Sequence, residues 1–363
     1  MRPMLSAINT HTYNISKFIT PLISNWSKNE HTINDSFSFV SDITNTTNNN
    51  YYMASFDITS LYTNISLKET IDIIINLAFD NESDKFHNFN KSQFKKLLEL
   101  SLLDTYFVFK DQLYKQINGL AMGQPVAPTM ANIFLCFYEK KWLNDCPIEF
   151  KPVKYKRYID DSFSFFKEKH HVDLFLNYLN NCHQSIKFTK EVEENNCLKF
   201  LDISITKDNN KFLTSTYRKP TFTGLIMNFN AFSPFNYKLN LIRTLLNRAY
   251  SISSSYLNFH LEVNYFKNIL MNNGYKITVI QKQIKSFLER KFNNKKVYYS
   301  VPKQEIFLKM PFYGNESYII RKKLNHLIKF YFPQVKLKVI FTTNCRIKCF
   351  FSSLKTRCLI RFI

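Results

Sequence analysis

The sequence predicts an α+β fold in which short antiparallel strands pack against amphipathic helices. Residues 153–166 contain two runs of alternating apolar and polar residues separated by "DD". Residues 66–78 and 235–288 carry apolar side chains at helical spacing. The chain has 363 residues, of which 45% are hydrophobic and 36 are phenylalanine, so it can bury a large core.

The charge balance favours a polyanionic partner. Lysine and arginine number 49 against 28 aspartate and glutamate, and the formal net charge of +21 is spread along the chain. Frequent Phe and Tyr among the lysines suit stacking on bases. An anionic membrane surface is the weaker alternative, because no basic amphipathic helix stands out and no apolar run reaches the length of a membrane span.

Cysteine usage and the N-terminal pattern indicate a reducing, intracellular setting. The seven cysteines are scattered, and the N-terminus does not show the order of a signal peptide. Cys345, Cys349 and Cys358 could suggest zinc, but their spacing is not that of a zinc finger and no histidine pair completes the set. We therefore expect no zinc site there.

A lone acid, Asp57, ends the first β-rich segment. The stretch "YYMASFDI" is rich in strand-forming residues, and Ser66 with Glu69 forms a capping box that begins a helix. This order of strand, tight turn and helix predicts that Asp57 lies at an exposed strand end. The residue could also simply cap the turn, as many such aspartates do.

Two further acids, Asp160 and Asp161, stand between alternating runs in "YKRYIDDSFSFF". The pattern predicts a hairpin with both aspartates in its turn. Aspartate is an ordinary turn residue, because its side chain can bond its own backbone. The alternative is a divalent cation, because Mg²⁺ binds carboxylate oxygens and shares its shell with substrate phosphates. A third carboxylate such as Asp57 would favour this second explanation.

A loop rich in glycine and proline leads into a helix at "GLAMGQPVAPTMANIF". Gly123 lets the backbone approach a ligand closely, and Pro128 is expected in the first helical turn. Such a helix start can present backbone N–H groups to phosphates or to a base pair, although many loop-to-helix joints look alike. We expect the helix to bury Ala131, Ile133, Phe134, Phe137 and Tyr138.

The second half of the chain changes from strands to helices. "CLKFLDISITKDNNKFLTSTYRKP" predicts two strands joined by a polar turn, and helical spacing begins at Phe235. Lys238, Arg243 and Arg248 fall off the apolar face of the first of these helices. Basic helices of this kind suit contact with a duplex backbone, although an ordinary solvated face would look the same.

Taken in order, "FDITSLY", "GLAMGQPVAP" and "YIDD" resemble motifs A, B and C of reverse transcriptases. The chain is more narrowly similar to Penelope-like retroelements, from residue 2 to about residue 355. The stretches that carry this similarity include "RPMLSAINTHTYNISKFI", "KFLDISITK", "STYRKPTFTG" and "LIRTLLNRAY". The joint order of these motifs is far more specific than any one of them.

The resemblance implies a right-hand polymerase palm, an antiparallel sheet with packed helices, with partial fingers and a helical thumb. Residues 1–50 would form the partial fingers, 51–222 the palm with a fingers insert at about 80–118, 223–335 the thumb, and 336–363 a truncated linker and tail. The implied activity is RNA-directed DNA synthesis. RNA template, DNA primer and dNTP would be the partners, DNA integration the wider process, and the nucleus the location.

The resemblance also implies a metal site. Asp57, Asp160 and Asp161 match the catalytic acids, and the backbone carbonyl of Ile58 matches a further ligand. These groups would hold two Mg²⁺ ions, or Mn²⁺ in their place. Two ions about 3.5–4 Å apart can activate a primer 3′-hydroxyl and stabilise the leaving oxygen of an in-line displacement.

A nucleotide pocket follows from the same resemblance. Tyr62 matches an aromatic residue that crowds the sugar 2′ position, although it could instead be a core tyrosine. Gly123, Gln124 and Pro128 match the loop beside the incoming base pair, and Arg2 matches an arginine that reaches the triphosphate.

Contacts with primer and template are implied for Tyr158, Arg218, Lys219 and the three basic helix residues named above. Arg218 and Lys219 could instead mark an exposed strand edge. A lysine that assists the triphosphate would be Lys187 or Lys190.

The chain departs from the family at both ends. The fingers are incomplete ahead of the "RP" motif, and the GIY-YIG endonuclease of many members does not follow "IFTTNCRIKCFFSSLK". We therefore expect a truncated reading frame from an element copy. A non-catalytic nucleic-acid-binding remnant is the main alternative to a polymerase, and a structural or membrane-surface protein is the third.

Overall fold

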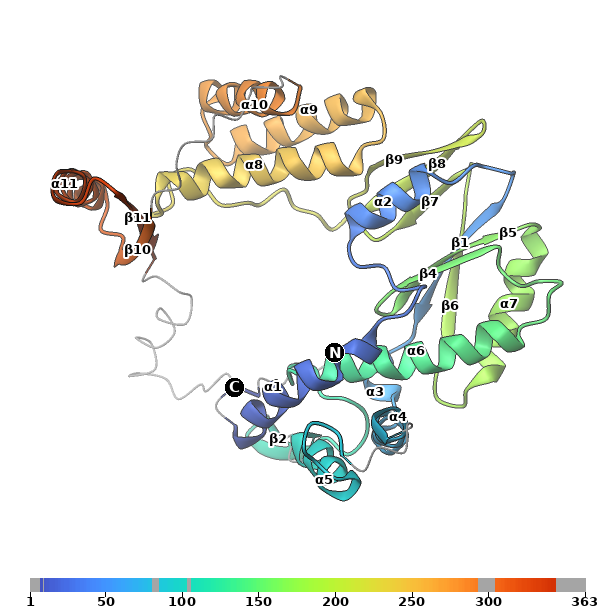
Figure 1. The fold of residues 1–363 in the computed structure, drawn as a ribbon. Helices are drawn as coiled ribbons and strands as arrows, with labels where there is room; N and C mark the ends of the chain where they lie inside the picture. The colour runs from blue at the N-terminus through green and yellow to red at the C-terminus, as the bar shows by residue number, and fades with distance from the viewer. Residues whose placement is uncertain (1–6, 9, 80–84, 103–105, 293–303, 344–363) are drawn as a thin grey trace. The chain divides into compact units, whose positions relative to one another are not determined.

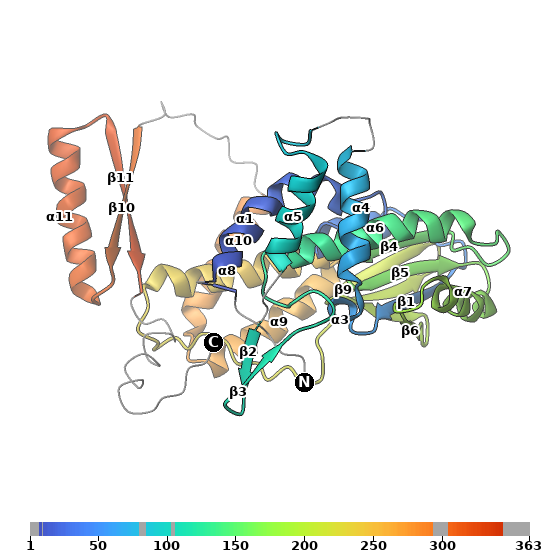
Figure 2. The ribbon, with the colours of Figure 1, turned by 90° about the horizontal axis from the view of Figure 1, so that it is seen from below.

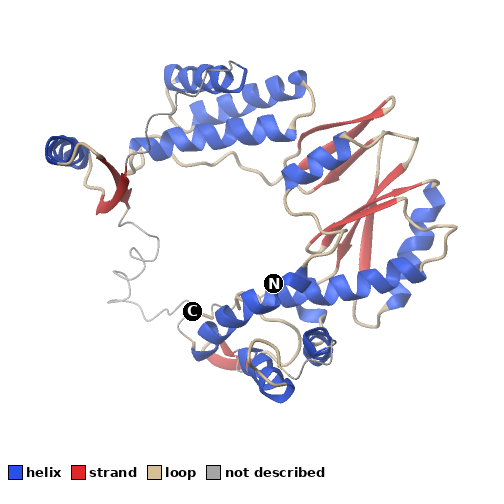
Figure 3. Ribbon diagram, in the orientation of Figure 1, coloured by secondary structure: helices blue, strands red, loops and turns tan. Residues whose placement is uncertain are grey.

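The computed structural model describes residues 7–8, 10–79, 85–102, 106–292 and 304–343. The chain divides into two compact units, unit 1 at Met1–Tyr217 and unit 2 from Arg218 onward. Both units combine helices and strands (Figure 3), so the predicted α+β class is confirmed.

A four-stranded antiparallel sheet forms the centre of unit 1 (Figure 1). Its strand order is β4-β5-β1-β6, so the strand that comes first in the chain lies inside the sheet. The strands are β1 (Tyr52–Ile58), β4 (Lys154–Tyr158), β5 (Asp161–Phe166) and β6 (Phe188–Val192). β1 pairs with both β5 and β6. The end of β1 therefore lies beside the starts of β5 and β6, although these strands are far apart in the sequence.

Two long helices cover one face of this sheet, which we call the helix face. They are α6 (Ala127–Asp145) and α7 (Lys169–Cys182). The ring of Phe175 on α7 packs at centroid distances of 5.6 Å from Phe56 and 5.5 Å from Phe166. Figure 2 shows α6 running alongside the strands.

A helix and a second sheet cover part of the opposite face. They are α2 (Ser36–Thr44) and the antiparallel strands β7 (Cys197–Phe200), β8 (Ile203–Asp208) and β9 (Lys211–Thr216). The Phe163 ring lies 5.2 Å from Phe39 and 5.5 Å from Phe200. Because both faces of β5 are covered, Ser162 and Ser164 are buried together with their apolar neighbours.

Further helices and a hairpin complete the described part of unit 1. They are α1 (His11–Ile23), the 3₁₀ turn η1 (Ser24–Ser27), α3 (Leu61–Asn64), α4 (Leu67–Phe79), α5 (Lys91–Leu102), β2 (Tyr106–Phe109) and β3 (Gln112–Lys115). α4 buries Ile71 and Ile74, as its spacing predicts. On α6, Ala131 and Phe134 are buried as expected, whereas Phe137 is 46% exposed.

Helices also form the core of unit 2. They are α8 (Phe235–Ile252), α9 (Tyr256–Asn272) and α10 (Ile277–Phe292). Ile242, Leu246, Phe266 and Ile280 meet between them and are at most 1% exposed. The apolar faces predicted for α8 and α10 are therefore confirmed.

A strand–helix–strand segment follows in unit 2. β10 (Gln304–Pro311) and β11 (Val335–Thr342) pair in parallel and are joined through α11 (Asn315–Tyr331). The Tyr237 hydroxyl on α8 donates to the Phe341 carbonyl at 2.7 Å and connects this segment to the helices. These strands differ from the helical thumb and tail expected here. Lysines that alternate with apolar residues along β11 are the strand signal.

None of the helices in the described ranges combines the length and apolar character that a membrane span requires.

Candidate active site

The ends of β1 and β5 bring two acids directly opposite each other. In the antiparallel register, Asp57 on β1 is the partner of Asp161 on β5. Side chains at directly opposed positions share one face, with Cβ atoms about 4.5–5.5 Å apart. Asp57 is exposed and Asp161 is half-buried, so the pair is accessible from solvent. Two like charges at such positions destabilise a sheet unless something offsets them.

The third acid, Asp160, lies in the turn before Asp161. The Ile58 N–H donates to the Asp160 carbonyl at 3.1 Å and ties this turn to the end of β1. Tyr158, the last residue of β4, is the register partner of Asp161 on its other side. The three acids therefore meet where β1 ends and β5 begins. We call this end of the sheet, with Asp57, Asp160 and Asp161, the acidic edge. A shared metal site at these residues requires that they lie close together in this way.

The hairpin turn begins earlier than the sequence pattern predicts. Ile159 and Asp160 form the turn, and Asp161 is already the first residue of β5. Ile159 has a φ of +57°, a left-handed value that is rare and strained for a β-branched residue. A two-residue hairpin turn with positive φ at its first position matches the twist of the strands, which explains the shift.

Tyr62 lies beside the acids on α3. The chain leaves β1 through Ser60, which has a φ of +53°, and enters this short helix at once. Burial raises the pKa of the half-buried Tyr62, and the negative charge of Asp160 raises it further. The two side chains are therefore close enough to interact.

The loop before α6 packs backbone to backbone against α3. The Leu120 N–H donates to the Tyr62 carbonyl at 2.6 Å. Gly119 has a φ of +76°, and a Cβ at this position would lie 2.6 Å from the Cα and carbonyl oxygen of Thr63. Glycine is therefore required at this position for two reasons: the positive φ disfavours other residues, and there is no space for a Cβ. The contact fixes the loop to the segment that follows Asp57.

Gln124 is the buried polar residue of this loop. It is 4% exposed, and within the described part of the chain its Nε2 has no hydrogen-bond partner. A buried donor without an acceptor costs about 1–3 kcal/mol, so this atom is suited to meeting a ligand or a water. Gly123, with a φ of +121°, and Pro128, in the first turn of α6, are both exposed next to it.

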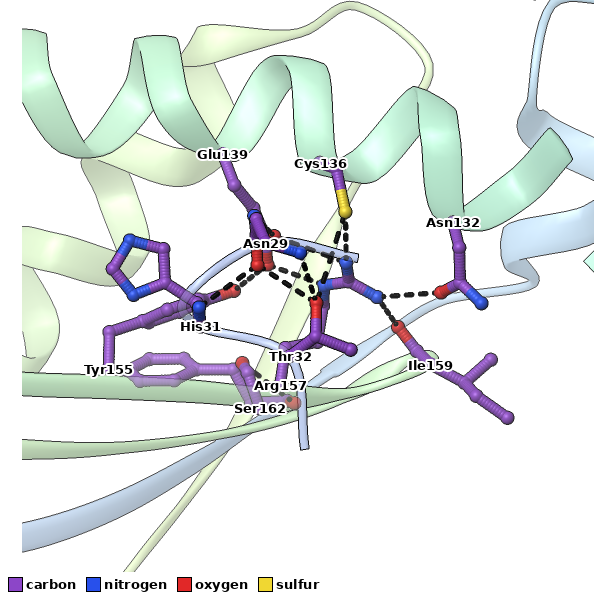
Figure 4. Close-up of polar contacts among 11 residues, drawn as sticks. Asn29, His31, Thr32, Asn132, Cys136, Glu139, Tyr155, Arg157, Ile159 and Ser162 are labelled. Atoms are coloured by element: carbon purple, nitrogen blue, oxygen red, sulfur yellow. Dashed lines mark hydrogen bonds and ion pairs between the residues drawn. The ribbon is translucent and has the colours of Figure 1, made fainter. Parts of the chain in front are cut away.

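A buried ion pair lies behind the acidic turn, on the helix face (Figure 4). Arg157 on β4 is 0% exposed and Glu139 on α6 is 2% exposed. The Arg157 guanidinium donates to both Glu139 oxygens through Nε and Nη2, and its Nη1 donates to the Ile159 carbonyl at 2.9 Å. Burial disfavours the charged form of Arg157, but Glu139 outweighs this effect and the pKa is raised.

The sequence pattern alone gave no role to this pair. Arg157 occupies the inward position of β4 between Tyr155 and Ile159, where the alternation leaves room for an apolar side chain. A basic residue at such a position signals a buried acid elsewhere in the chain, because an unpaired buried charge is too costly. Glu139, among the apolar residues of α6, is the matching signal.

The two lysines considered for the triphosphate lie differently. Lys190 is the register partner of Phe56 and forms an ion pair with Asp173, so it lies on the helix face. The Lys187 carbonyl accepts from the Thr59 N–H at 2.9 Å, which places this residue next to the end of β1. Of the two, Lys187 lies at the edge that carries the acids.

Arg218 and Lys219 begin unit 2 in different settings. Arg218 pairs with Glu262 and lies 4.1 Å over the Tyr265 ring. This pairing offsets its charge and holds it inside unit 2, which makes it a poor phosphate contact. Lys219 is exposed.

The basic residues of α8 are half-buried along one helix. Arg243 donates from Nε to Gln283 on α10 at 3.0 Å, and Lys238 lies 5.2 Å over the Phe229 ring. Arg248 is also half-buried. Arg2 and the three C-terminal cysteines considered above lie outside the described residues.

A separate group of possible metal ligands begins α7. One ligand atom each from Glu168, His170 and His171 lies within 4.8 Å of the others, and the first two residues are exposed. The group follows the end of β5 opposite to the end that carries Asp161.

Comparison with protein families shows to which family the chain belongs. Residues 1–213, more than half of its 363 residues, match the family described as reverse transcriptase (RNA-dependent DNA polymerase). The chain belongs to the reverse transcriptase family. Its fold is the right-hand polymerase palm, and all three acids lie within the matched residues. Residues 225–285 of this reverse transcriptase also match the animal helix-turn-helix domain, which covers α8, α9 and part of α10.

Solved structures similar to this reverse transcriptase include two telomerases and a viral RNA-dependent RNA polymerase. Telomerase from Candida tropicalis is 14% identical with a TM-score of 0.46, and 79% of this chain and 51% of that chain are covered. Telomerase from Candida albicans, solved with a fragment of telomeric RNA, is 14% identical with a TM-score of 0.43, covering 78% and 55%. The Sicinivirus RNA-dependent RNA polymerase is 15% identical with a TM-score of 0.40, covering 70% and 54%. The chain thus spans about half the length of these three proteins. A comparison with curated proteins gave no match.

Proposed function

We propose that this reverse transcriptase is the RNA-directed DNA polymerase of a Penelope-like retroelement, adding dNTPs to a primer 3′-hydroxyl on an RNA template. The observation that carries the proposal is the register of Asp57 with Asp161, with Asp160 in the adjoining turn. It supports nucleotidyl transfer because this chemistry needs carboxylates from separate segments around the same cations. The motifs shared with Penelope-like elements support the narrower assignment. By the same resemblance we expect the protein to act in DNA integration, in the nucleus.

The acidic edge fits a pair of Mg²⁺ ions. Asp57, Asp160 and Asp161 offer hard oxygen donors at a solvent-accessible position, and the backbone carbonyl of the buried Ile58 would add a fourth. This is the ligand set that Mg²⁺ and Mn²⁺ prefer. Bound ions would activate the primer 3′-hydroxyl and neutralise charge on the reacting phosphates. The acids would hold them from two sides, β1 and the hairpin, and their own repulsion would be offset.

Other residues of the chain would position the nucleotide. Tyr62, next to the acids, would crowd the sugar 2′ position and exclude ribonucleotides. Gly123 and Pro128 would let the loop backbone approach the new base pair, and Nε2 of Gln124 would find its acceptor there. Arg2 would reach the triphosphate, as the resemblance implies.

Duplex binding would use the basic surface and the helices of unit 2. Lys219, Lys238, Arg243 and Arg248 would contact phosphates, with Arg218 held in a supporting position by its ion pair. The match to a helix-turn-helix domain and the net charge of +21 support a nucleic-acid partner. Tyr158, opposite Asp161 in the hairpin, would contact the primer end.

Primer extension tests this proposal. The purified chain is incubated with an RNA template, a DNA primer, dNTPs and Mg²⁺, beside the Asp160→Asn and Asp161→Asn variants. We expect extension by the parent chain and none by the variants, while all three bind the primer–template equally well. Duplex binding without extension by the parent chain would contradict the proposal and support a non-catalytic nucleic-acid-binding protein.

A further inference from the structure

Arg157 is fully buried directly behind the acidic edge. Its register partner across the hairpin is Ser162, so it lies on the helix face, whereas Asp57 and Asp161 share the opposite face. Arg157 therefore cannot touch a substrate bound at the acids. It nevertheless contacts the turn that carries Asp160.

The guanidinium joins two elements through one rigid group. Its Nη2 donates to Oε2 of Glu139 on α6 at 3.1 Å, and Nε donates to the other carboxylate oxygen. Its Nη1 donates to Oδ1 of Asn132, also on α6, at 3.0 Å and to the Ile159 carbonyl at 2.9 Å, and Figure 4 shows these bonds converging on the arginine. A lysine ammonium is a point charge and cannot reproduce this planar fork.

The turn itself needs outside support. Ile159 has a φ of +57°, and a strained conformation of this kind persists where the surroundings over-determine it. Two neighbouring carbonyls of the turn are fixed, that of Ile159 by Arg157 and that of Asp160 by the Ile58 N–H. Arg157 thus holds the turn from the helix face, and the end of β1 holds it from the neighbouring strand.

Stability alone does not explain a buried ion pair at this place. Well-packed apolar residues in the same volume are often as stabilising or more so. The pair also anchors an N-terminal segment, because Asn29 donates to Glu139 at 2.9 Å and the Arg157 N–H donates to the His31 carbonyl at 2.8 Å. A purely structural role in holding that segment is the alternative that an experiment must separate.

We propose that Arg157 and Glu139 form a positioning pair that keeps the Ile159–Asp160 turn in the conformation in which Asp160 and Asp57 bind the same cations. The proposal rests on the proposed polymerase function and adds a determinant of its metal site. The pair connects α6, the helix that follows the loop with Gly123 and Gln124, to the Ile159–Asp160 turn. It thereby holds α6 and the turn in a fixed relative position.

The Arg157→Lys variant of the full chain tests the pair. Mn²⁺ binding is measured by electron paramagnetic resonance without nucleic acid, together with kcat for extension and the Kd for primer–template. We expect Mn²⁺ affinity and kcat to fall about 10- to 100-fold, the usual effect of losing a group that orients metal ligands. The Kd for primer–template should stay unchanged.

Two control variants separate positioning from general stability. Lys154→Gln breaks the ion pair of Lys154 with Asp42, at 2.7 Å, on the same strand but away from the turn. Asn29→Ala removes the N-terminal segment's bond to Glu139 and leaves the Arg157–Ile159 bond in place. Both should lower Tm and leave Mn²⁺ affinity unchanged. Wild-type Mn²⁺ affinity in Arg157→Lys, or an equal loss in the controls, would overturn the proposal.

If Arg157→Lys does not fold, the double variant Arg157→Met/Glu139→Met decides the question. This change replaces both buried charges with apolar side chains, so neither charge is left unpaired, and it removes the bond to the Ile159 carbonyl. Weaker Mn²⁺ binding with a folded chain supports the pair, and parental affinity overturns it. A parent chain that neither binds Mn²⁺ nor extends a primer contradicts the proposed function itself, whereas an active parent with unaffected variants contradicts only the positioning pair.

Discussion

Tyr62 is the residue on which nucleotide selectivity is expected to depend. Replacing it with alanine should open space at the sugar 2′ position and lower the preference for dNTP over rNTP in kcat/KM, by about 10- to 200-fold. Tyr62→Phe is the matched control, because it keeps the ring and loses only the hydroxyl near Asp160. If Tyr62→Ala discriminates as well as the parent chain, the residue is a core tyrosine and no steric gate.

We expect Asp161 to lower the stability of the metal-free fold and to increase its affinity for metal ions. In metal-free buffer, Asp161→Asn removes a like charge opposite Asp57 and should stabilise the fold by about 0.2–1 kcal/mol, or about 1–3 °C in Tm. Saturating Mg²⁺ should reverse the order, because the parent chain binds the ion more tightly in its folded state. Calorimetry with EDTA and with Mg²⁺ measures both effects, and an equal Mg²⁺ shift in parent and variant would contradict them.

At the residue scale, the sequence reveals groups that carry a motif but hides groups that act through a partner. The sequence marks Asp57 as a candidate because it ends a β-rich run, and Asp160 and Asp161 because they stand between two alternating runs. Arg157 could not be found in this way, because its meaning depends on Glu139 and on the helix that brings the two together. The positive φ of Ile159 was equally hidden, since it is imposed by the hairpin and not by the residue.

At the element scale, Gly119 lies where the loop before α6 packs against α3. Gly119→Ala should bring a Cβ to 2.6 Å from the Thr63 backbone at a φ of +76° and destabilise the chain by at least about 1–3 kcal/mol. Extension should fall even where the chain remains folded, because the loop separates from α3. Chemical denaturation and primer extension measure the two effects.

Gly224→Ala is the control for this prediction. Gly224 has a similar φ of +71°, but its nearest neighbour for a new Cβ is the flexible Ile269 side chain at 3.8 Å. It should show the conformational cost alone, about 1 kcal/mol, with extension retained. Equal effects of the two substitutions would show that the close contact at Gly119 is unimportant.

Elements with strong local signals could be predicted and those defined by pairing could not. α4 and α8 follow from their apolar spacing, and β1 from its run of strand formers. The region after Glu194 was expected to hold two strands, whereas the structure has three, because Leu201 turns the chain with a φ of +51° and separates β7 from β8. The turn contains no glycine, and Asp202, a common turn residue, is a weak sequence signal for it.

At the scale of the whole molecule, the charge should govern binding to primer–template. The logarithm of the association constant should fall linearly with the logarithm of salt concentration. Replacing Lys238, Arg243 and Arg248 with glutamine should reduce the slope by up to about 2–3, since each lost phosphate contact removes about 0.9. Fluorescence anisotropy at several salt concentrations measures it.

A charge-matched variant controls for net charge. Replacing Lys322, Lys323 and Lys329 of α11 with glutamine removes the same three charges from an exposed helix. Its slope should change little. Equal slopes in the two triple variants would mean that binding follows net charge and not the surface of α8.

Iron-directed cleavage tests most directly whether the acids surround one metal site. Fe²⁺ bound in place of Mg²⁺, with ascorbate and peroxide, cuts the backbone next to it, and mass spectrometry maps the cuts. We expect cuts around both Asp57 and Asp160, suppressed together by excess Mg²⁺ and by Asp57→Asn. Cuts near only one of these residues, or cuts confined to the Glu168–His171 group, would contradict a shared site at the acidic edge.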